Sequence, residues 1–170
     1  MSVPAPAGIA LDFDALYRAA RDDVFAYVAT LLHDRGAAED VTALAFERAF
    51  RKRGKFDAKR GSQRAWLFGI ARNAALDELR TRRRSAALAT EPASDAVAPE
   101  DEAELALRRA AVRTALAALP AREREVIALK FHAGLDNAEL AAVLEISVSN
   151  AGTRLHRALT TLREALDDRS

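Results

Sequence analysis

Apolar residues recur every three or four positions along almost the whole chain, and this spacing constrains the fold more than any other feature. Such a period places apolar side chains on one face of an α-helix. Alanine, leucine, arginine and glutamate dominate these segments, and all four favour helix. Glycine and proline are few and fall mainly between the periodic segments, where they would separate helices. The sequence therefore predicts an all-α protein.

Three helices are predicted in the first half of the chain, at residues 12–33, 37–53 and 62–84. Gly54 directly follows the second and is expected to close it in the manner of a C-terminal cap glycine. Ser62 is expected to cap the N-terminus of the third. Three helices of this length can bury one small core, which predicts a helical bundle.

Residues 85–104 interrupt the helical period and predict a flexible acidic linker. They are rich in alanine, serine and proline, and they carry six acidic residues and no basic residue. Helices resume after this segment, with Pro120 expected at the first position of one helix and Gly134 expected to end it. The predicted organisation is a disordered tail, two small helical domains and a linker, at residues 1–11, 12–84, 105–170 and 85–104 respectively.

The most specific local pattern spans residues 136–162. Asp136 and Glu139 have the spacing of a capping box, which predicts a short helix. A three-residue break and a longer helix, at about 148–166, complete a helix-turn-helix layout. The second helix of such a motif enters the major groove of DNA. The polar residues predicted to face DNA, with Arg157 on backbone phosphate, are Ser149, Asn150, Thr153, Arg154 and Arg157.

The internal contacts of this motif are assigned to its apolar residues. These are Leu140, Leu144, Ile146, Val148, Ala151 and Leu155. A plain helical hairpin with a solvated polar face is the alternative interpretation of the same pattern.

Residues 51–84 form a basic block, with 12 Lys and Arg against 3 Asp and Glu. Phe56 and Trp66 lie among these cations, a mixture that suits single-stranded nucleic acid. Two structural alternatives remain open. Cations at 80–84 would also be favoured by the dipole of a helix C-terminus, and Trp66 fits the apolar stripe, so we expect it to belong to the core.

Several function classes are disfavoured by residues that the sequence lacks. It has no cysteine, which excludes disulfides and thiolate metal sites and fits a cytoplasmic protein. The three histidines are scattered, and no phosphate-binding glycine loop or catalytic motif occurs, so we expect neither an enzyme nor a cofactor nor a metal site. No apolar run approaches the ~20 residues that cross a bilayer, so no membrane insertion is expected.

Four segments resemble the extracytoplasmic-function (ECF) sigma factors of the sigma-70 family. Residues 38–50 resemble the helix that binds core RNA polymerase, and residues 64–80 resemble the helix that contacts the promoter −10 element. Residues 117–126 and 154–158 resemble the C-terminal domain of the family. Two distinct motifs thus occur in the family's order, with an acidic linker between them.

The resemblance implies that the chain is a promoter-recognition factor. Its contacts with core RNA polymerase would be Glu39, Asp40 and Arg48. Its contacts with the melted −10 strand would be Lys55, Phe56, Lys59, Arg60, Arg64, Asn73, Asp77 and Arg80. The helix-turn-helix would read the duplex −35 element, and the ~20-residue linker could span at most ~70 Å between the two sites. An anti-sigma factor is the expected regulatory partner.

The chain departs from the family pattern at three places. Ala43-Leu44 stands where Gln-Glu is usual, in the segment implied to contact polymerase. Glu145 replaces the usual turn glycine, where a positive φ is mildly strained. Gly152 stands where lysine is common, which removes one phosphate contact and costs ~1 kcal/mol of helix propensity relative to alanine.

Two other functions fit part of the sequence. A helix-turn-helix regulator that binds operators without polymerase would account for 136–162 and leave the basic block unexplained. A decoy that binds anti-sigma factors and has lost promoter function would account for the departures at Ala43, Leu44 and Gly152. Transcription with core polymerase distinguishes both from a working sigma factor.

Overall fold

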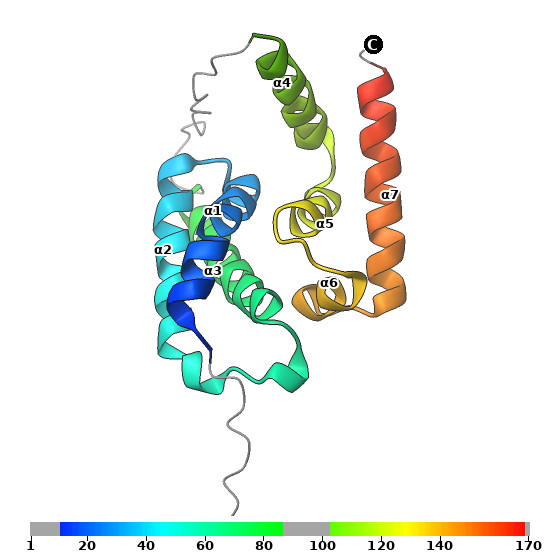
Figure 1. Cartoon of the computed structure of the whole chain (residues 1–170). Helices are drawn as coiled ribbons and strands as arrows, with labels where there is room; N and C mark the ends of the chain where they lie inside the picture. The colour runs from blue at the N-terminus through cyan, green and yellow to red at the C-terminus, as the bar shows by residue number, and fades with distance from the viewer. Residues whose placement is uncertain (1–10, 87–102, 169–170) are drawn as a thin grey trace, which may run out of the picture.

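The computed structural model describes residues 11–86 and 103–168, and both ranges are built from helices (Figure 1). No strand occurs within them, so the predicted all-α class is confirmed. The N-terminal half, residues 11–86, contains α1 (Phe13–Leu32), α2 (Arg35–Arg51), η1 (Arg53–Lys55), η2 (Ala58–Arg60) and α3 (Gln63–Ala86). The C-terminal half, residues 103–168, contains α4 (Ala103–Ala118), α5 (Ala121–Phe131), α6 (Asn137–Leu144) and α7 (Val148–Asp167). Residues 1–10 of the predicted tail and 87–102 of the predicted linker lie outside the described residues.

Helix starts in the N-terminal half follow the capping residues in the sequence. The Asp12 carboxylate accepts from the Ala15 amide at 3.1 Å at the start of α1. The Ser62 hydroxyl accepts from the Ala65 amide at 3.1 Å, which confirms it as the cap of α3. Each side chain satisfies a backbone donor that a helix N-terminus leaves without an intrahelical partner.

The expectation that Gly54 ends α2 as a left-handed cap is wrong. The helix ends at Arg51, and the chain continues into η1, where the Lys55 amide donates to the Lys52 carbonyl at 2.8 Å. Gly54 lies inside this turn and does not have a positive φ. A tightened 3-10 turn satisfies the terminal carbonyls in place of a glycine cap.

The connections of the C-terminal half match the sequence closely. The capping box is present: the Glu139 amide donates to Asp136 Oδ1 at 2.8 Å, and the Asp136 amide donates to Glu139 Oε1 at 3.2 Å. Gly134 takes the left-handed conformation that ends the turn after α5, with φ 66°. Pro120 precedes α5 as its N-cap, with ψ 146°, and is not the first helical residue as expected. An extended ψ keeps it outside the helix.

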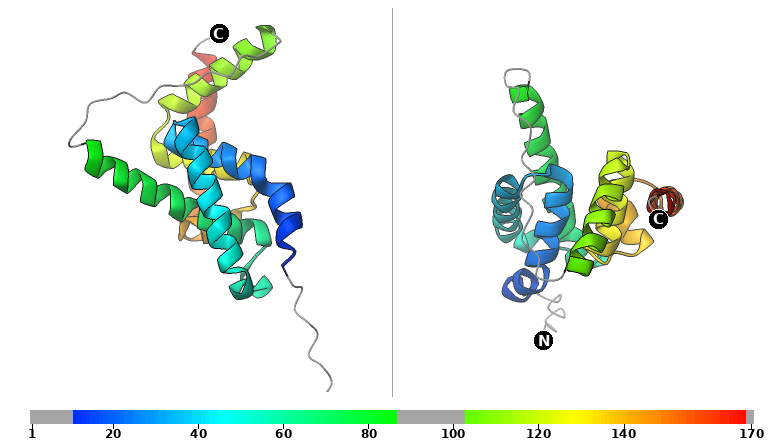
Figure 2. Two further views of the ribbon diagram at one scale, coloured as in Figure 1. Left: turned by 90° about the vertical axis from the view of Figure 1, so that its left-hand side faces the viewer. Right: turned by 90° about the horizontal axis from the view of Figure 1, so that it is seen from above.

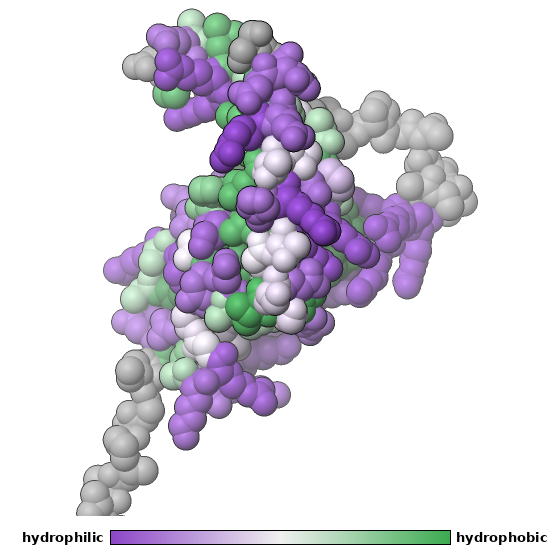
Figure 3. All heavy atoms as spheres, turned by 90° about the vertical axis from the view of Figure 1, so that its right-hand side faces the viewer, coloured by the Kyte–Doolittle hydropathy of each residue, from purple (hydrophilic) through white to green (hydrophobic). Residues whose placement is uncertain are grey.

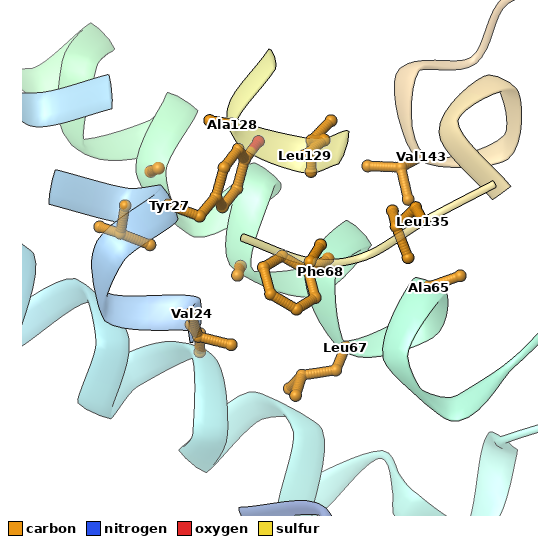
Figure 4. Close-up of a cluster of buried hydrophobic side chains, with 14 of the residues drawn as sticks. Val24, Tyr27, Ala65, Leu67, Phe68, Ala128, Leu129, Leu135 and Val143 are labelled. Carbon is orange, nitrogen blue, oxygen red and sulfur yellow. The ribbon is translucent and has the colours of Figure 1, made fainter. Parts of the chain in front are cut away.

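The two halves pack against each other, which the sequence did not predict. α1 and α3 of the N-terminal half contact α5 and α6 of the C-terminal half, while α7 lies on the far side of α5 and α6 (Figures 1 and 2). One hydrophobic core runs through both halves. Figure 4 shows Phe68 of α3 beside Leu129 of α5, with Leu135 and Val143 next to Ala65. The C-terminal half is therefore held against the face of α1 and α3.

α4 packs against α7 through only part of its apolar stripe. Leu119, which follows it, is buried, but Leu105 and Val112 are 41% and 40% exposed. The apolar side of α4 is therefore half covered within the described residues.

Candidate nucleic-acid interface

The residues predicted to read the −35 element lie together on α7. Ser149, Asn150, Thr153 and Arg157 are exposed, and Arg154 is half-buried. Figure 3 views the molecule from the α7 side, where hydrophilic and neutral surface predominates over the described residues. A helix with an exposed polar and cationic face has the diameter and chemistry that the major groove admits. The five residues remain predictions as DNA contacts.

Two hydrogen bonds from backbone amides order the turn between α6 and α7. The Ser147 hydroxyl caps α7 by accepting from the Asn150 amide at 3.0 Å, and the Ile146 amide donates to the Ala141 carbonyl at 3.0 Å. Glu145 adopts the left-handed conformation, φ 58°, where the family pattern has glycine. Its backbone therefore keeps the expected turn at the strain cost of a non-glycine residue.

The predicted internal contacts of the helix-turn-helix are correct with one exception. Leu140 and Ala151 are fully buried between α6 and α7. Val148 is 54% exposed, so its assignment to the interior is wrong. Val148 is the first residue of α7, and Ala151 in the next turn packs in the interior instead.

Gly152 lies on α7 close to α6, but there is room for a larger side chain at this position. A Cβ at this position would lie 3.5 Å from Asn137 Nδ2, an ordinary van der Waals contact. The absence of a side chain at Gly152 is therefore not a packing requirement.

The first part of the basic block, residues 53–62, forms an exposed loop before α3. Lys55, Lys59 and Arg60 lie on or next to η1 and η2 and are exposed. Phe56 is half-buried, and its ring meets that of Trp66 edge-on, with centroids 5.6 Å apart. Trp66 packs against the core, as expected, and keeps part of its surface in the cleft beside the loop.

An outward face of α3 carries three of the predicted −10 contacts. Asn73, Asp77 and Arg80 are spaced at i, i+4 and i+7, which places them on one side of the helix, and all three are exposed. Asp77 binds two guanidinium groups: Arg80 Nη1 lies 3.2 Å and Arg48 Nη1 3.3 Å from its carboxylate. A predicted polymerase contact on α2 is thereby joined to predicted DNA contacts on α3, a link that the sequence did not reveal.

The outer face of α2 mixes acidic and apolar side chains. Glu39 and Asp40 are exposed, and Glu39 pairs with Arg35 one turn earlier at 3.5 Å. Leu44 and Phe50 are 36% and 47% exposed on the same helix. This face has both charge and apolar area available for a partner.

A buried polar cluster at the contact between the halves was missed by the sequence reasoning. Glu125 of α5 is 8% exposed, and its Oε1 accepts from Tyr27 Oη at 2.9 Å and from Arg72 Nε at 2.6 Å. Burial, followed by the adjacent Glu125 carboxylate, raises the pKa of Tyr27 well above its ordinary value, so the hydroxyl remains a donor. The three residues lie far apart in sequence, and no local pattern connects them.

Arg64, a predicted −10 contact, is half-buried at the same contact between the halves. Its Nε donates to the Ala133 carbonyl at 2.9 Å, and its Nη2 donates to Asp23 at 2.8 Å and to the His132 carbonyl at 3.3 Å. Partial burial lowers the pKa of the His132 imidazole, against an opposing effect of Asp23. The prediction placed Arg64 on DNA, whereas in this structure its donors bind protein.

No group of three potential metal ligands occurs within residues 11–86 and 103–168. None of the helices in these ranges is long and apolar enough to span a membrane.

Comparison with known proteins gives two family matches. The family described as Sigma-70 region 2 matches residues 16–85, and Sigma-70, region 4 matches residues 109–162. ECF RNA polymerase sigma factor SigK of Mycobacterium tuberculosis is 32% identical over 91% of this chain and 86% of its own length. ECF RNA polymerase sigma factor BldN of Streptomyces coelicolor is 33% identical over 96% of this chain, which spans 64% of that protein.

A solved structure resembles the chain across both halves. The sigma factor RpoE in complex with the anti-sigma factor NepR, from Bartonella quintana, has a TM-score of 0.79 at 26% identity, over 92% of this chain and 97% of that one. Each half contains fewer than half of the 170 residues. A score this high therefore requires the two halves to be placed relative to each other as they are in that structure.

Proposed function

The chain belongs to the ECF group of the sigma-70 family of RNA polymerase sigma factors, and from this we propose that it directs promoter-specific transcription initiation. The observation that carries the proposal is the pair of region matches in one chain, at 16–85 and 109–162. Such a factor acts by binding rather than by catalysis, and it works in the cytoplasm with core polymerase. In this proposal residues 12–84 bind core polymerase and the −10 element, residues 85–104 link the two halves, and residues 105–170 bind the −35 element.

The proposed polymerase contact is the outer face of α2. Glu39 and Asp40 supply charge there, and Leu44 supplies apolar area where the family pattern has glutamate. Arg48 pairs with Asp77 of α3 at 3.3 Å. We expect this contact to depend more on apolar burial, and less on salt, than one built on Gln-Glu.

The proposed −10 contact uses the loop at η1 and η2 together with α3. Lysine and arginine on the loop supply charge for backbone phosphates, and Phe56 and Trp66 supply ring surface for an unstacked base. Asn73 and Asp77 offer hydrogen-bonding groups on the adjacent helix face. An extruded base exposes edges that pairing otherwise hides, so a melted strand can be read in sequence.

The proposed −35 contact is α7 in the major groove. We expect Asn150, Thr153 and Arg154 to reach base edges, and Ser149 and Arg157 to reach phosphate. With Gly152 in place of lysine, the factor makes one phosphate contact fewer, so its binding depends less steeply on salt.

An anti-sigma factor is the proposed regulatory partner. RpoE of B. quintana was solved with an anti-sigma factor, and its halves are placed as in this chain. The exposed apolar residues of α4, among them Leu107 at 73% exposure, offer surface to such a protein.

The test is transcription with purified core RNA polymerase, this protein and a library of promoter fragments from its host. We expect transcripts that start at discrete sites only when the protein is present. Glu39→Lys with Asp40→Lys should reduce core binding, whereas Arg157→Ala should leave core binding intact and weaken promoter binding. Core binding without transcripts would favour the decoy, and absence of core binding would favour an operator-binding regulator.

A further inference from the structure

The arginines in the last turns of α3 do not all face the same way. Arg83 and Arg84 are exposed where α3 projects past α1 and α2 (Figure 2), and neither forms an ion pair within residues 11–86 and 103–168. The Arg82 side chain is only 30% exposed, because it reaches back to the other two helices. One arginine of the basic cluster at 80–84 therefore binds the protein itself, while its two neighbours face solvent.

Each nitrogen of the Arg82 guanidinium has an acceptor. Its Nη1 donates to the Leu32 carbonyl at 2.8 Å, its Nη2 to Asp34 Oδ2 at 3.1 Å and its Nε to Glu78 Oε1 at 3.3 Å. Leu32 ends α1, and a helix C-terminus leaves its last carbonyls without intrahelical partners. Asp34 is the N-cap of α2. Arg82 therefore ties the end of α3 to the turn between α1 and α2.

Asp34 uses its two carboxylate oxygens for different partners. Oδ1 accepts from the Ala37 amide at 3.1 Å and so caps α2, whereas Oδ2 accepts from Arg82. The ion pair thus holds the carboxylate in the orientation that capping requires. A negative charge here also faces the positive end of the helix dipole, and the first turn of α2 contains no acidic residue of its own. The start of α2 therefore depends on one carboxylate that Arg82 holds in place.

The first turn of α2 needs this support because its own sequence favours helix weakly. Gly36 is its second residue, and glycine is the least favourable residue in a helix after proline. Glu39 and Asp40, the proposed polymerase contacts, follow within the next turn, and Glu39 pairs with Arg35 of the first turn at 3.5 Å. Fraying of the first turn would therefore displace the charged part of the proposed polymerase contact.

We propose that Arg82 is a positioning residue for the polymerase-binding end of α2, and not a DNA contact of the basic block. The proposal rests on the proposed sigma function and adds a residue to its polymerase contact. Arg82 acts through Asp34, which keeps the first turn of α2 formed. When that turn frays, only the molecules in which it is formed bind polymerase, so the apparent Kd rises. The helix assigned to the −10 strand thereby also supports docking of polymerase on its neighbour.

The experiment measures the Kd of the full-length chain for purified core RNA polymerase. Fluorescence anisotropy of the labelled chain reports binding, at a temperature at which circular dichroism shows every variant to be folded. Arg82→Gln and Arg83→Gln remove the same charge from adjacent positions, so the second is the matched control.

A second pair of variants tests whether Arg82 acts through the first turn of α2. Gly36→Ala strengthens this turn without restoring the ion pair, since a Cβ there would lie 3.6 Å from Asp34 Oδ1, an ordinary contact. The substitution is made in the Arg82→Gln background and, as its control, in the native chain.

We expect Arg82→Gln to weaken core binding about fivefold, which corresponds to the loss of one helix cap. Arg83→Gln should change it by less than about twofold, as is usual for an exposed charge. Gly36→Ala should restore most of the affinity lost in Arg82→Gln. It should change the native chain less, because the first turn is already formed there.

Equal affinities of Arg82→Gln and Arg83→Gln would overturn the proposal, because a residue that only stabilises the fold leaves the affinity of the folded protein unchanged. Failure of Gly36→Ala to restore binding would overturn it as well. So would a flatter salt dependence of promoter binding by the Arg82→Gln holoenzyme, by about 0.9 in the log–log slope, since this marks a lost phosphate contact.

If Arg82→Gln does not fold, Asp34→Asn takes its place, with the same expected loss and the same restoration by Gly36→Ala. Asparagine still caps a helix but carries no charge for the guanidinium to bind. A native chain that does not bind core polymerase is a failure of the sigma function itself, whereas a native chain that binds no better than Arg82→Gln is a failure of this proposal alone.

Discussion

Single residues of this chain show how backbone conformation and surface chemistry are decided separately. Gly134 and Gly152 are both glycines of the C-terminal half, but only Gly134 has a positive φ. At Gly152 the backbone is helical, and a side chain would fit. The first glycine serves the turn, whereas the second leaves one position on the surface of α7 without a side chain.

This difference predicts opposite effects of alanine at the two positions. Gly152→Ala should stabilise the protein by about 0.5–1 kcal/mol, because alanine has the higher helix propensity and meets no steric obstacle. Gly134→Ala should destabilise it by about 1 kcal/mol, because alanine resists the left-handed conformation. Urea unfolding of both variants measures the two signs, and equal signs would contradict the argument.

The lowered pKa of His132 predicts a loss of stability in mild acid. Because burial lowers the pKa in the folded state, the unfolded chain binds more protons below its own pKa of about 6.5. The stabilisation is therefore complete above pH 6.5 and is lost as pH falls through the folded-state pKa. The difference in Tm between pH 7.5 and pH 5.5 should be smaller for His132→Gln than for the native chain. His156→Gln, on the exposed face of α7, is the control and should leave the difference unchanged.

At the scale of elements, the helix-turn-helix depends on local bonds at both of its helix starts. Asp136 and Glu139 close the capping box of α6, and Ser147 caps α7. These bonds set where each helix begins, and hence which residues of α7 face outward.

Loss of the α6 cap should weaken DNA binding through the placement of α7. Asp136→Ala is expected to cost about 1 kcal/mol of stability and to speed hydrogen exchange of the Glu139 amide. Binding to a −35 duplex taken from the transcription assay should weaken in parallel. Asp12→Ala removes the equivalent cap of α1 and should leave duplex binding unchanged. If both variants lose duplex binding equally, the α6 cap acts on binding only through global stability.

A lysine restored on α7 should make duplex binding more dependent on salt. Gly152→Lys adds one cation on the proposed DNA face, so the slope of log Kd against log salt should steepen by about 0.9. Titrations of the same −35 duplex between about 50 and 200 mM salt measure this slope. Gly152→Gln is the neutral control with a similar side-chain length, and a slope equal to that of the lysine variant would contradict a phosphate contact.

At the scale of the whole molecule, stability and the relative placement of the two halves depend on the same contact. The shared core and the Glu125 cluster hold the halves together, and α6 covers the cleft because of that contact. A change at the contact is therefore expected to alter the shape of the chain as well as its stability.

Glu125→Gln should weaken the contact between the halves. It removes the charge that pairs with Arg72, leaving a partly buried guanidinium without its anion, and should cost about 1–2 kcal/mol. Small-angle scattering should show a larger radius of gyration than for the native chain. Glu78→Gln breaks an ion pair within α3 alone and is the matched control, for which no expansion is expected. A native-like radius for Glu125→Gln would mean that the apolar core alone keeps the halves closed.

The sequence by itself determined the helices, their principal caps and the helix-turn-helix. These features depend on residues three or four positions apart, so the Ser62 cap and the Asp136 capping box could be identified from the sequence. The errors at Gly54, Pro120 and Val148 are of one turn or less and arise where adjacent local geometries differ little in energy. Predicted contacts such as Asn73 and Arg157 lie on exposed faces for the same local reason.

Only the tertiary structure decided how the two halves meet. The Glu125 cluster joins residues 98 and 53 positions apart, and Arg64 finds its acceptors 68 and 69 positions away. No local period encodes such pairs, because they depend on which apolar faces of the assembled helices bury each other. That α6 lines the cleft beside the predicted −10 residues is therefore a property of the packed molecule, although Lys55, Phe56 and Asn73 could be named as candidates from the sequence.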